Sequence, residues 1–324
     1  MAGAGPRTLV VQWAQEHGEV GGVLTSHTQL TAQLRDEGSE VLYVDTGSAR
    51  RALGALPRLW QRPALHLFHI TRLWRAIVLA PVFALQRGRT VLVLHSGSVA
   101  GQLASMGRVR AALLRVSLAA YDEVWAVNEE IGRLLPPGSR VVRVVTPFAV
   151  EPAAGEGPQR TGHLISLATN AGLPHYNAEL GVEAVRRVRE VWPDATLRIL
   201  AYGHDGDAMA RLRSAVYRLD WVDLSFDAGP AEVRAVLEQS AVFLRPTSWD
   251  GDSVVVREAL ALGARVVASD VAARPPGVEL APLDAAALAE AVLHGGRRST
   301  GEGLATTSLL EAVHGAVAAM RPSA

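Results

Sequence analysis

The stretch at positions 245–270, RPTSWDGDSVVVREALALGARVVASD, constrains the fold more than any other part of the chain. An apolar strand, Ala241–Leu244, leads into a polar turn, and a helix and a second apolar strand, Arg265–Ala268, follow. Short, continuous apolar strands on either side of a helix are typical of a parallel sheet that is covered on both faces. We therefore expect a strand–turn–helix–strand unit whose turn lies at the carboxyl edge of the sheet, where open α/β sheets bind ligands.

Two carboxylates flank this turn. Asp250 lies on the loop, and we expect Glu258 about two turns into the helix. Carboxylates accept hydrogen bonds from sugar hydroxyls, and the backbone N–H groups at the helix start can hold phosphate oxygens. The turn thus predicts a site for a phosphorylated sugar. A simpler alternative for Asp252 is that it caps the helix.

The same alternation of strands and helices runs through the whole chain and predicts an α/β fold. The expected strands are 8–13, 40–44, 66–70, 90–94, 123–127, 141–145, 163–167, 196–201 and 223–226, and the expected helices include 108–120, 178–191, 231–239 and 304–320. Gly38 and Gly263 stop helices, and Asn128 caps one. A segment rich in Pro, Gly and Glu, 147–160, reads as a linker. We expect two Rossmann-like domains, 1–150 and 151–324, with parallel sheets facing a central cleft and a C-terminal helix that can pack back on the first domain.

Composition excludes several classes of function. The 324 residues contain no cysteine and no lysine, so thiolate nucleophiles, cysteine-ligated metals, a Walker P-loop lysine and a pyridoxal-phosphate Schiff base are ruled out. No GxGxxG follows an expected strand, which disfavours a nicotinamide dehydrogenase. No cluster of His and carboxylates has metal-site spacing, and His66 and His69 read as packing residues. Without a signal peptide or a long apolar span, we expect a cytoplasmic protein.

Arginine is unevenly distributed. Residues 46–121 contain 11 Arg and no Asp or Glu, and Trp60 and Trp74 lie among them. One interpretation is a solvated face with accidental clustering. The other is a basic face for an anionic or lipid-linked acceptor, or for peripheral contact with the inner face of a membrane. Nucleic acid is disfavoured because no binding module accompanies the charge.

The quoted motifs resemble those of the retaining GT-B glycosyltransferases of family 4 (group 1). In that family a Glu-x7-Glu motif precedes a Gly-x-Pro-Val-Val-Ala-Ser strand, and DGDSVVVREALALGARVVASD is similar, with Asp250 in place of the first Glu and Glu258 as the second. GEVGGVLTSHTQL resembles the family's glycine loop, and VLVLHSGS its His-Gly element.

The resemblance implies roles for individual residues. Glu258 would bind the nucleotide ribose, Asp250 the donor sugar, and His95 would face the reacting sugar or the acceptor. The remaining donor-binding candidates are the loop glycines Gly21 and Gly22, the helix-start residues Asp252, Ser253 and Val254, and Asn170, His175, Tyr176 and Arg245. The resemblance further implies transfer from a nucleotide-diphosphate sugar, in bacterial polysaccharide or glycoconjugate biosynthesis, with no cofactor and no metal.

One departure keeps alternatives open. The family supplies an Arg and a Lys for the diphosphate from the loop after the first strand of the second domain. Here that loop, ATNAGLPHYNAE, has neither, and the position of the Lys falls near Tyr176. Because stabilising the departing anion is the main electrostatic task of this chemistry, their loss is costly. A catalytically silent subunit that activates a partner glycosyltransferase, and a nucleotide-sugar epimerase, are therefore alternatives.

Overall fold

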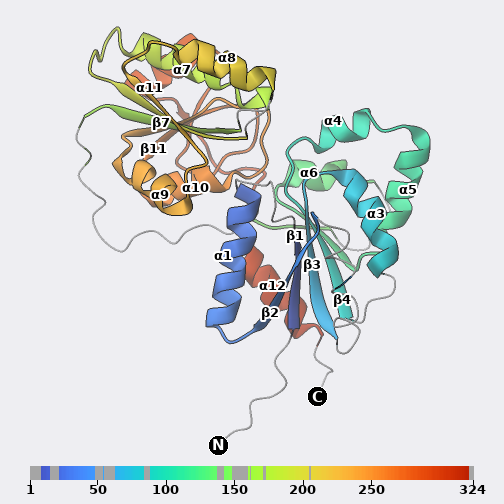
Figure 1. Ribbon diagram of the computed structural model, residues 1–324. Coiled ribbons are helices and arrows are strands. Elements are labelled where there is room, and N and C mark those ends of the chain that lie inside the picture. The colour runs from blue at the N-terminus through green and yellow to red at the C-terminus, as the bar shows by residue number, and fades with distance from the viewer. Residues whose placement is uncertain are drawn as a thin grey trace, which may run out of the picture. The chain divides into compact units, whose positions relative to one another are not determined.

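The computed structural model describes residues 9–14, 22–47, 54, 63–83, 88–136, 142–147, 160, 162–170, 173–203 and 206–320. The chain divides into two compact units, each with its own sheet and helices (Figure 1). The first unit comprises residues 1–19, 23–148 and 303–324, and the second comprises 20–22 and 149–302.

The first unit is built on a parallel sheet with the strand order β2-β1-β3-β4-β5-β6. Its strands are β1 (Leu9–Ala14), β2 (Glu40–Asp45), β3 (Ala64–Ile70), β4 (Gly88–Leu94), β5 (Glu123–Ala126) and β6 (Val142–Val144). Its helices are α1 (Gly22–Asp36), α3 (Leu73–Phe83), α4 (Val99–Ala104), α5 (Arg108–Leu118), α6 (Glu129–Leu134) and α12 (Leu309–Ala318).

These helices form two layers. One face of the sheet packs against α3, α4, α5 and α6, and the other packs against α1 and α12 (Figure 1). The last helix, α12, is held in this unit by its buried Leu309 and Val313 and by backbone pairing of Thr146 with the segment that precedes it. Burial on both faces explains why the strands are continuously apolar.

The second unit has the strand order β13-β12-β11-β10-β7-β8-β9, in which only β13 is antiparallel among the strands that the structure describes. The strands are β7 (Leu164–Asn170), β8 (Thr196–Tyr202), β9 (Val222–Phe226), β10 (Val242–Arg245), β11 (Arg265–Ser269), β12 (Glu279–Ala281) and β13 (Arg297–Arg298). The helices are α7 (Ala178–Val188), α8 (Asp207–Val216), α9 (Pro230–Gln239), α10 (Val254–Ala261) and α11 (Ala285–His294), with a single 3-10 turn, η1 (Pro174–Tyr176).

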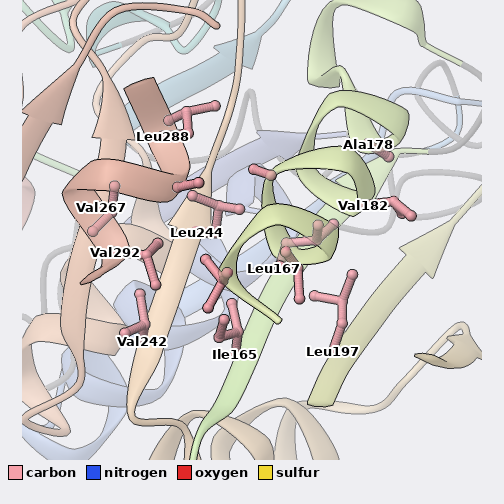
Figure 2. Close-up of a cluster of buried hydrophobic side chains, with 14 of the residues drawn as sticks. Ile165, Leu167, Ala178, Val182, Leu197, Val242, Leu244, Val267, Leu288 and Val292 are labelled. Carbon is pink, nitrogen blue, oxygen red and sulfur yellow. The ribbon is translucent and has the colours of Figure 1, made fainter. Parts of the chain in front are cut away.

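The core of the second unit lies between the central strands and the helices α7 and α11. Figure 2 shows side chains of β7 and β10, including Ile165 and Leu244, in one buried cluster with side chains of α7 and α11, such as Val182 and Leu288. Gly181 on α7 matches this close packing, because a Cβ there would come within 2.8 Å of Leu167 Cδ2. The central strands are thus fixed tightly, and so are the loops that follow them.

Local signals behave as the sequence predicts. Gly38 and Gly263 follow α1 and α10 with φ of +85° and +77°, and Asn128 accepts a hydrogen bond from the Ile131 N–H at the start of α6. Several helices are shorter than expected, including α7 and α12. The sequence does not predict α4, α8, α11, β12 or β13. None of the described helices is both long and apolar enough to cross a membrane.

Candidate functional site

The strand order of the second sheet creates a topological switch point between β7 and β10. From β7 the chain proceeds outward through β8 and β9, and from β10 it proceeds the other way through β11 and β12. The loops at the carboxyl ends of such neighbouring strands diverge and leave a place for a ligand. Asn170 ends β7 and Arg245 ends β10, so both of these predicted site residues lie at the switch point.

A buried ionic network occupies this edge. Arg245 donates from Nε to Asp250 Oδ2 at 2.9 Å and from Nη2 to Oδ1 at 3.3 Å. Arg274, on the loop between β11 and β12, donates from Nη1 to the same Asp250 Oδ2 at 2.6 Å and from Nη2 to Thr247 Oγ1 at 2.9 Å. Arg274 is only 1% exposed, and Arg245 is 6% exposed. Two guanidiniums therefore share one carboxylate away from water, and this trio carries a net charge of +1.

The network fixes the ionisation of its members. Burial opposes the charged form of Asp250, but the Arg245 and Arg274 guanidiniums outweigh it and hold the pKa of Asp250 well below its usual value. Burial likewise opposes the charge on Arg245, but Asp250 outweighs it and raises the Arg245 pKa. Asp250 and Arg245 thus both stay charged at neutral pH. Within the described part of the chain, the buried Nε of Arg274 has no hydrogen-bond partner.

The loop after β7 is joined to the loop after β10. The guanidinium of Arg245 lies over the Tyr176 ring, with 4.8 Å between Cζ and the ring centroid. Trp249 stacks on His175 with ring centroids 3.6 Å apart, and Ser248 N–H donates to the His175 carbonyl. Burial, then the charge of Arg245, lowers the pKa of His175 to about 4, so its imidazole is neutral. The structure thus brings His175, Tyr176, Arg245 and Asp250 together.

The start of α10 corrects two expectations. Asp252 does not cap the helix: its carboxylate accepts from Arg257 Nε at 2.7 Å and Nη2 at 2.5 Å, and Ser253 occupies the cap position without a side-chain cap bond. Burial raises the pKa of Asp252, although Arg257 opposes the shift. Because α10 begins at Val254, Glu258 is half-buried little more than one turn into the helix, not two.

A different arrangement occupies the carboxyl edge of the first sheet. His95 directly follows β4, and its Nε2 lies 2.9 Å from Nδ1 of His69, which is one residue from the end of β3. His27, on α1, lies 5.7 Å from His69 between ring centroids. His69 was expected only to pack, so its hydrogen bond to His95 corrects that interpretation. His66 is fully buried and accepts a hydrogen bond from Trp13 Nε1.

Burial keeps these three imidazoles neutral. It lowers the pKa of His27 to about 4 and that of His69 well below its usual value, and neighbouring histidines add to the shift for His69. Burial, then His27, lowers the pKa of His95 to about 3. Among the described residues, Nε2 of His69 has no hydrogen-bond partner. An unpaired acceptor is tolerated better than an unpaired N–H, so we assign His69 Nδ1 as the donor and His95 Nε2 as the acceptor of this hydrogen bond, with the proton of His95 on Nδ1.

Other predicted residues are less informative. Gly22 begins α1 and is exposed, whereas Gly21 lies outside the described residues. Of the arginine-rich stretch, 48–53, 55–62 and 84–87 also lie outside them, and Trp60 with them. The described residues contain no group of three or more His, Asp or Glu side chains placed to hold a metal ion.

Three side chains at these edges escaped sequence reasoning. Arg274 lies 24 residues from its carboxylate partner in a loop without a motif, and no pattern marks it. Trp249 adjoins the predicted turn, and His69 stands on a predicted strand, so proximity to known candidates was the available signal for both.

Comparisons with known proteins agree with this architecture. Residues 165–295, within the second unit, match the family model described as glycosyl transferases group 1. No curated protein sequence shows significant similarity to the chain.

Solved structures resemble the chain at low identity. Sucrose-phosphate synthase from Thermosynechococcus elongatus is 18% identical with a TM-score of 0.65, over 97% of this chain and 95% of that one. TarM of S. aureus, in complex with fondaparinux, alpha-GlcNAc-glycerol and UDP, is 13% identical with a TM-score of 0.57, over 75% of this chain and 51% of that one. The pneumococcal O-GlcNAc transferase GtfA, in complex with UDP and GlcNAc, is 12% identical with a TM-score of 0.57, over 83% and 56%.

The chain thus spans about half the length of TarM and GtfA. At these identities the likeness shows the fold, which is the GT-B type of α/β fold with two parallel-dominated sheets. The predicted fold class is confirmed.

Proposed function

We propose that this chain is a glycosyltransferase that transfers a sugar from a nucleotide-diphosphate sugar to an acceptor hydroxyl. The observation that carries the proposal is the Arg245–Asp250–Arg274 network beside the start of α10, at the switch point of the second sheet. A surplus buried cation and the positive end of a helix both favour an anionic ligand. The match of residues 165–295 to a glycosyltransferase family model supports it, and so do the UDP complexes of TarM and GtfA.

The network supplies charge that the loop after β7 lacks. Arg245 and Arg274 take the place of the missing Arg and Lys pair and offset the charge that develops on the departing diphosphate. Asp250 already accepts from both arginines and contacts the donor sugar with its remaining lone pairs. Glu258 accepts from the ribose, and the backbone N–H groups of Asp252, Ser253 and Val254 hold sugar or phosphate oxygens.

Transfer proceeds with retention in this proposal. The acceptor oxygen bonds to the anomeric carbon on the face from which the diphosphate leaves, and the acceptor proton passes to the departing phosphate oxygen. The chain then contributes orientation and charge stabilisation in place of a strong base. His95 serves the reaction from the first unit, where the basic stretch suits an anionic or lipid-linked acceptor in bacterial polysaccharide or glycoconjugate biosynthesis. Because arginines carry the diphosphate charge, turnover should survive EDTA.

A thermal-shift screen with UDP-, GDP- and ADP-glucose tests donor binding. One donor at 100 times its Kd should stabilise the protein by about 2.7 kcal/mol. Glu258→Ala should abolish the shift, whereas Glu290→Ala, an exposed glutamate on α11 of the same unit, should keep it. If no nucleotide sugar shifts the transition, the donor assignment is wrong.

Product formation separates the remaining functions. Slow release of the nucleoside diphosphate from the stabilising donor supports transfer. Donor binding without any turnover supports a silent subunit that activates a partner. Isomerisation of the donor without an acceptor supports an epimerase.

A further inference from the structure

The outer face of α3 and α5 exposes apolar side chains that a surface helix usually buries. Trp74 and Val78 on α3 are 50% and 60% exposed, and Val109, Leu113 and Val116 on α5 are 75%, 49% and 72% exposed. Five large apolar side chains on two helices of one layer are more than scattered exposure explains. We call these five residues the α3–α5 face.

Helix geometry gathers these residues into stripes. On α5, Val109, Leu113 and Val116 are spaced by four and three residues, so they share one side of the helix. The buried Leu114 and Leu118 lie on the opposite side, in the core of the first unit. On α3, Trp74 and Val78 are likewise four residues apart, and the buried Leu73 and Ala76 face the core. The inner sides of both helices are buried in the core of the first unit, whereas packing within this unit does not account for the apolar residues on their outer sides.

Arginines border the apolar stripe of α5. Arg108 and Arg115 flank it on one side and Arg110 on the other, and all three are exposed. No acidic side chain within the described residues pairs with any of the three, and positions 46–121 contain no Asp or Glu at all. The outer side of α5 is thus apolar at its centre and bordered by arginines.

We propose that the α3–α5 face docks peripherally on an anionic lipid bilayer. Apolar side chains entering the headgroup boundary and arginines meeting anionic headgroups are what an interfacial helix needs, and tryptophan favours that depth. A second copy of the chain fits poorly, because pairing two such faces would juxtapose arginines without an acidic counterpart. Docking goes beyond sugar transfer, and it can be measured without a donor or an acceptor.

Vesicle co-sedimentation tests the proposal with the full chain. The protein should pellet with vesicles of 70% phosphatidylcholine and 30% phosphatidylglycerol, and much less with pure phosphatidylcholine. Leu113→Gln with Val116→Gln should lower the partition coefficient about tenfold or more, because it removes the apolar contacts. Arg108→Gln with Arg110→Gln should lower the partition coefficient about fivefold for each arginine. High salt should also lower the partition coefficient of the parent, because it screens the attraction to anionic headgroups.

Matched controls lie on the second unit. Val191→Gln is an equally exposed apolar substitution, and Arg297→Gln with Arg298→Gln removes two exposed arginines; both should bind vesicles like the parent. Unchanged melting temperatures show that all variants are folded. The proposal is overturned if the parent does not bind the anionic vesicles, or if the controls lose binding as much as the α3–α5 variants. It is also overturned if the parent is a dimer that Leu113→Gln dissociates. A failed donor screen leaves this result untouched.

Discussion

Each unit has polar side chains at the carboxyl edge of its sheet, but they are charged in the second unit and neutral in the first. At the carboxyl edge of the second sheet, the carboxylate of Asp250 pairs with the guanidiniums of Arg245 and Arg274 through short hydrogen bonds. At the corresponding edge of the first sheet, His27, His69 and His95 are neutral. Among the described residues, both ring nitrogens of His27 and Nε2 of His69 lack partners.

The difference shows how one architecture serves two tasks. We call the edge with Arg245, Asp250 and Arg274 the ionic edge, and the edge with His27, His69 and His95 the histidine edge. A buried charge is stable only if it is paired, so the ionic edge is rigid, and its surplus positive charge suits an anionic ligand. Neutral imidazoles cost less to bury, and each has one donor and one acceptor nitrogen, which suits an uncharged hydroxyl. We therefore expect substitutions at the ionic edge to change stability most, and those at the histidine edge to show in pH dependence and turnover.

The largest effect should come from Asp250→Asn. The amide would leave two buried guanidiniums without a negative partner, and breaking a buried pair in this way costs about 3–5 kcal/mol of unfolding free energy. Urea denaturation measures the loss. Asp250→Asn combined with Arg274→Met should recover part of it, because the double variant removes one of the stranded charges.

An exposed ion pair of the same unit provides the control. Asp223, paired with Arg198, is 60% exposed, so Asp223→Asn should cost no more than about 1 kcal/mol. If Asp250→Asn and Asp223→Asn lower the unfolding free energy equally, the stability of the ionic edge does not depend on buried charge.

The next effect is acid sensitivity at the histidine edge. The folded pKa of His27 is about 4, below its ordinary value of 6.5, so the unfolded chain binds more protons between these values. Stability must therefore fall as the pH drops through this window, by about 2 kcal/mol from His27 alone between pH 7 and pH 5. The lowered pKa of Asp250 acts only below its ordinary value of 3.8 and does not contribute here.

His27→Leu should remove that share of the pH dependence. Denaturation of parent and variant at pH 7 and pH 5 measures it, and the difference also cancels the contribution of His175, which has a similarly lowered pKa. His294→Leu, an exposed histidine on α11, is the control and should keep the slope of the parent. If the unfolding free energy of His27→Leu changes with pH as much as that of the parent, the His27 imidazole is not buried in its neutral form.

The fold and the turn around Asp250 could be predicted from the sequence, but the side chains that pair with the predicted site residues could not. Continuous apolar strands alternating with helices predict two parallel sheets, because burial on both faces demands that pattern. The turn around Asp250 was identifiable from local signals. Arg274 was not, since its contact depends on how the loop after β11 returns to the edge.

His69 shows a second limit. All seven residues of β3 are buried, so alternation cannot distinguish a histidine that packs from one that reaches the strand end. Only the register with β4, which ends at Leu94, brings His69 beside His95. Pairing between strands carries that information, and it is absent from the pattern within one strand.

A smaller effect should separate positioning from packing at this edge. His69→Leu removes the hydrogen bond that orients His95, so turnover should fall about tenfold with little change in the KM for the donor. His69→Asn can still bond to His95 and should recover part of the loss. Nitrogen NMR of His95 should show a changed tautomer in His69→Leu but not in His294→Leu. An unaltered tautomer would assign His69 to packing after all.

The smallest effect concerns stacking at the ionic edge. Trp249 and His175 stack at 3.6 Å, and Trp192 and His163 stack at 4.3 Å at the opposite edge of the same sheet. Each pair should contribute about 1 kcal/mol beyond buried area, so Trp249→Leu and Trp192→Leu should destabilise the protein alike. Only Trp249→Leu should weaken donor binding in the thermal-shift screen, because His175 belongs to the loop over Arg245. If Trp192→Leu weakens donor binding as much as Trp249→Leu does, donor binding depends on overall stability and not on the stacked pair at the ionic edge.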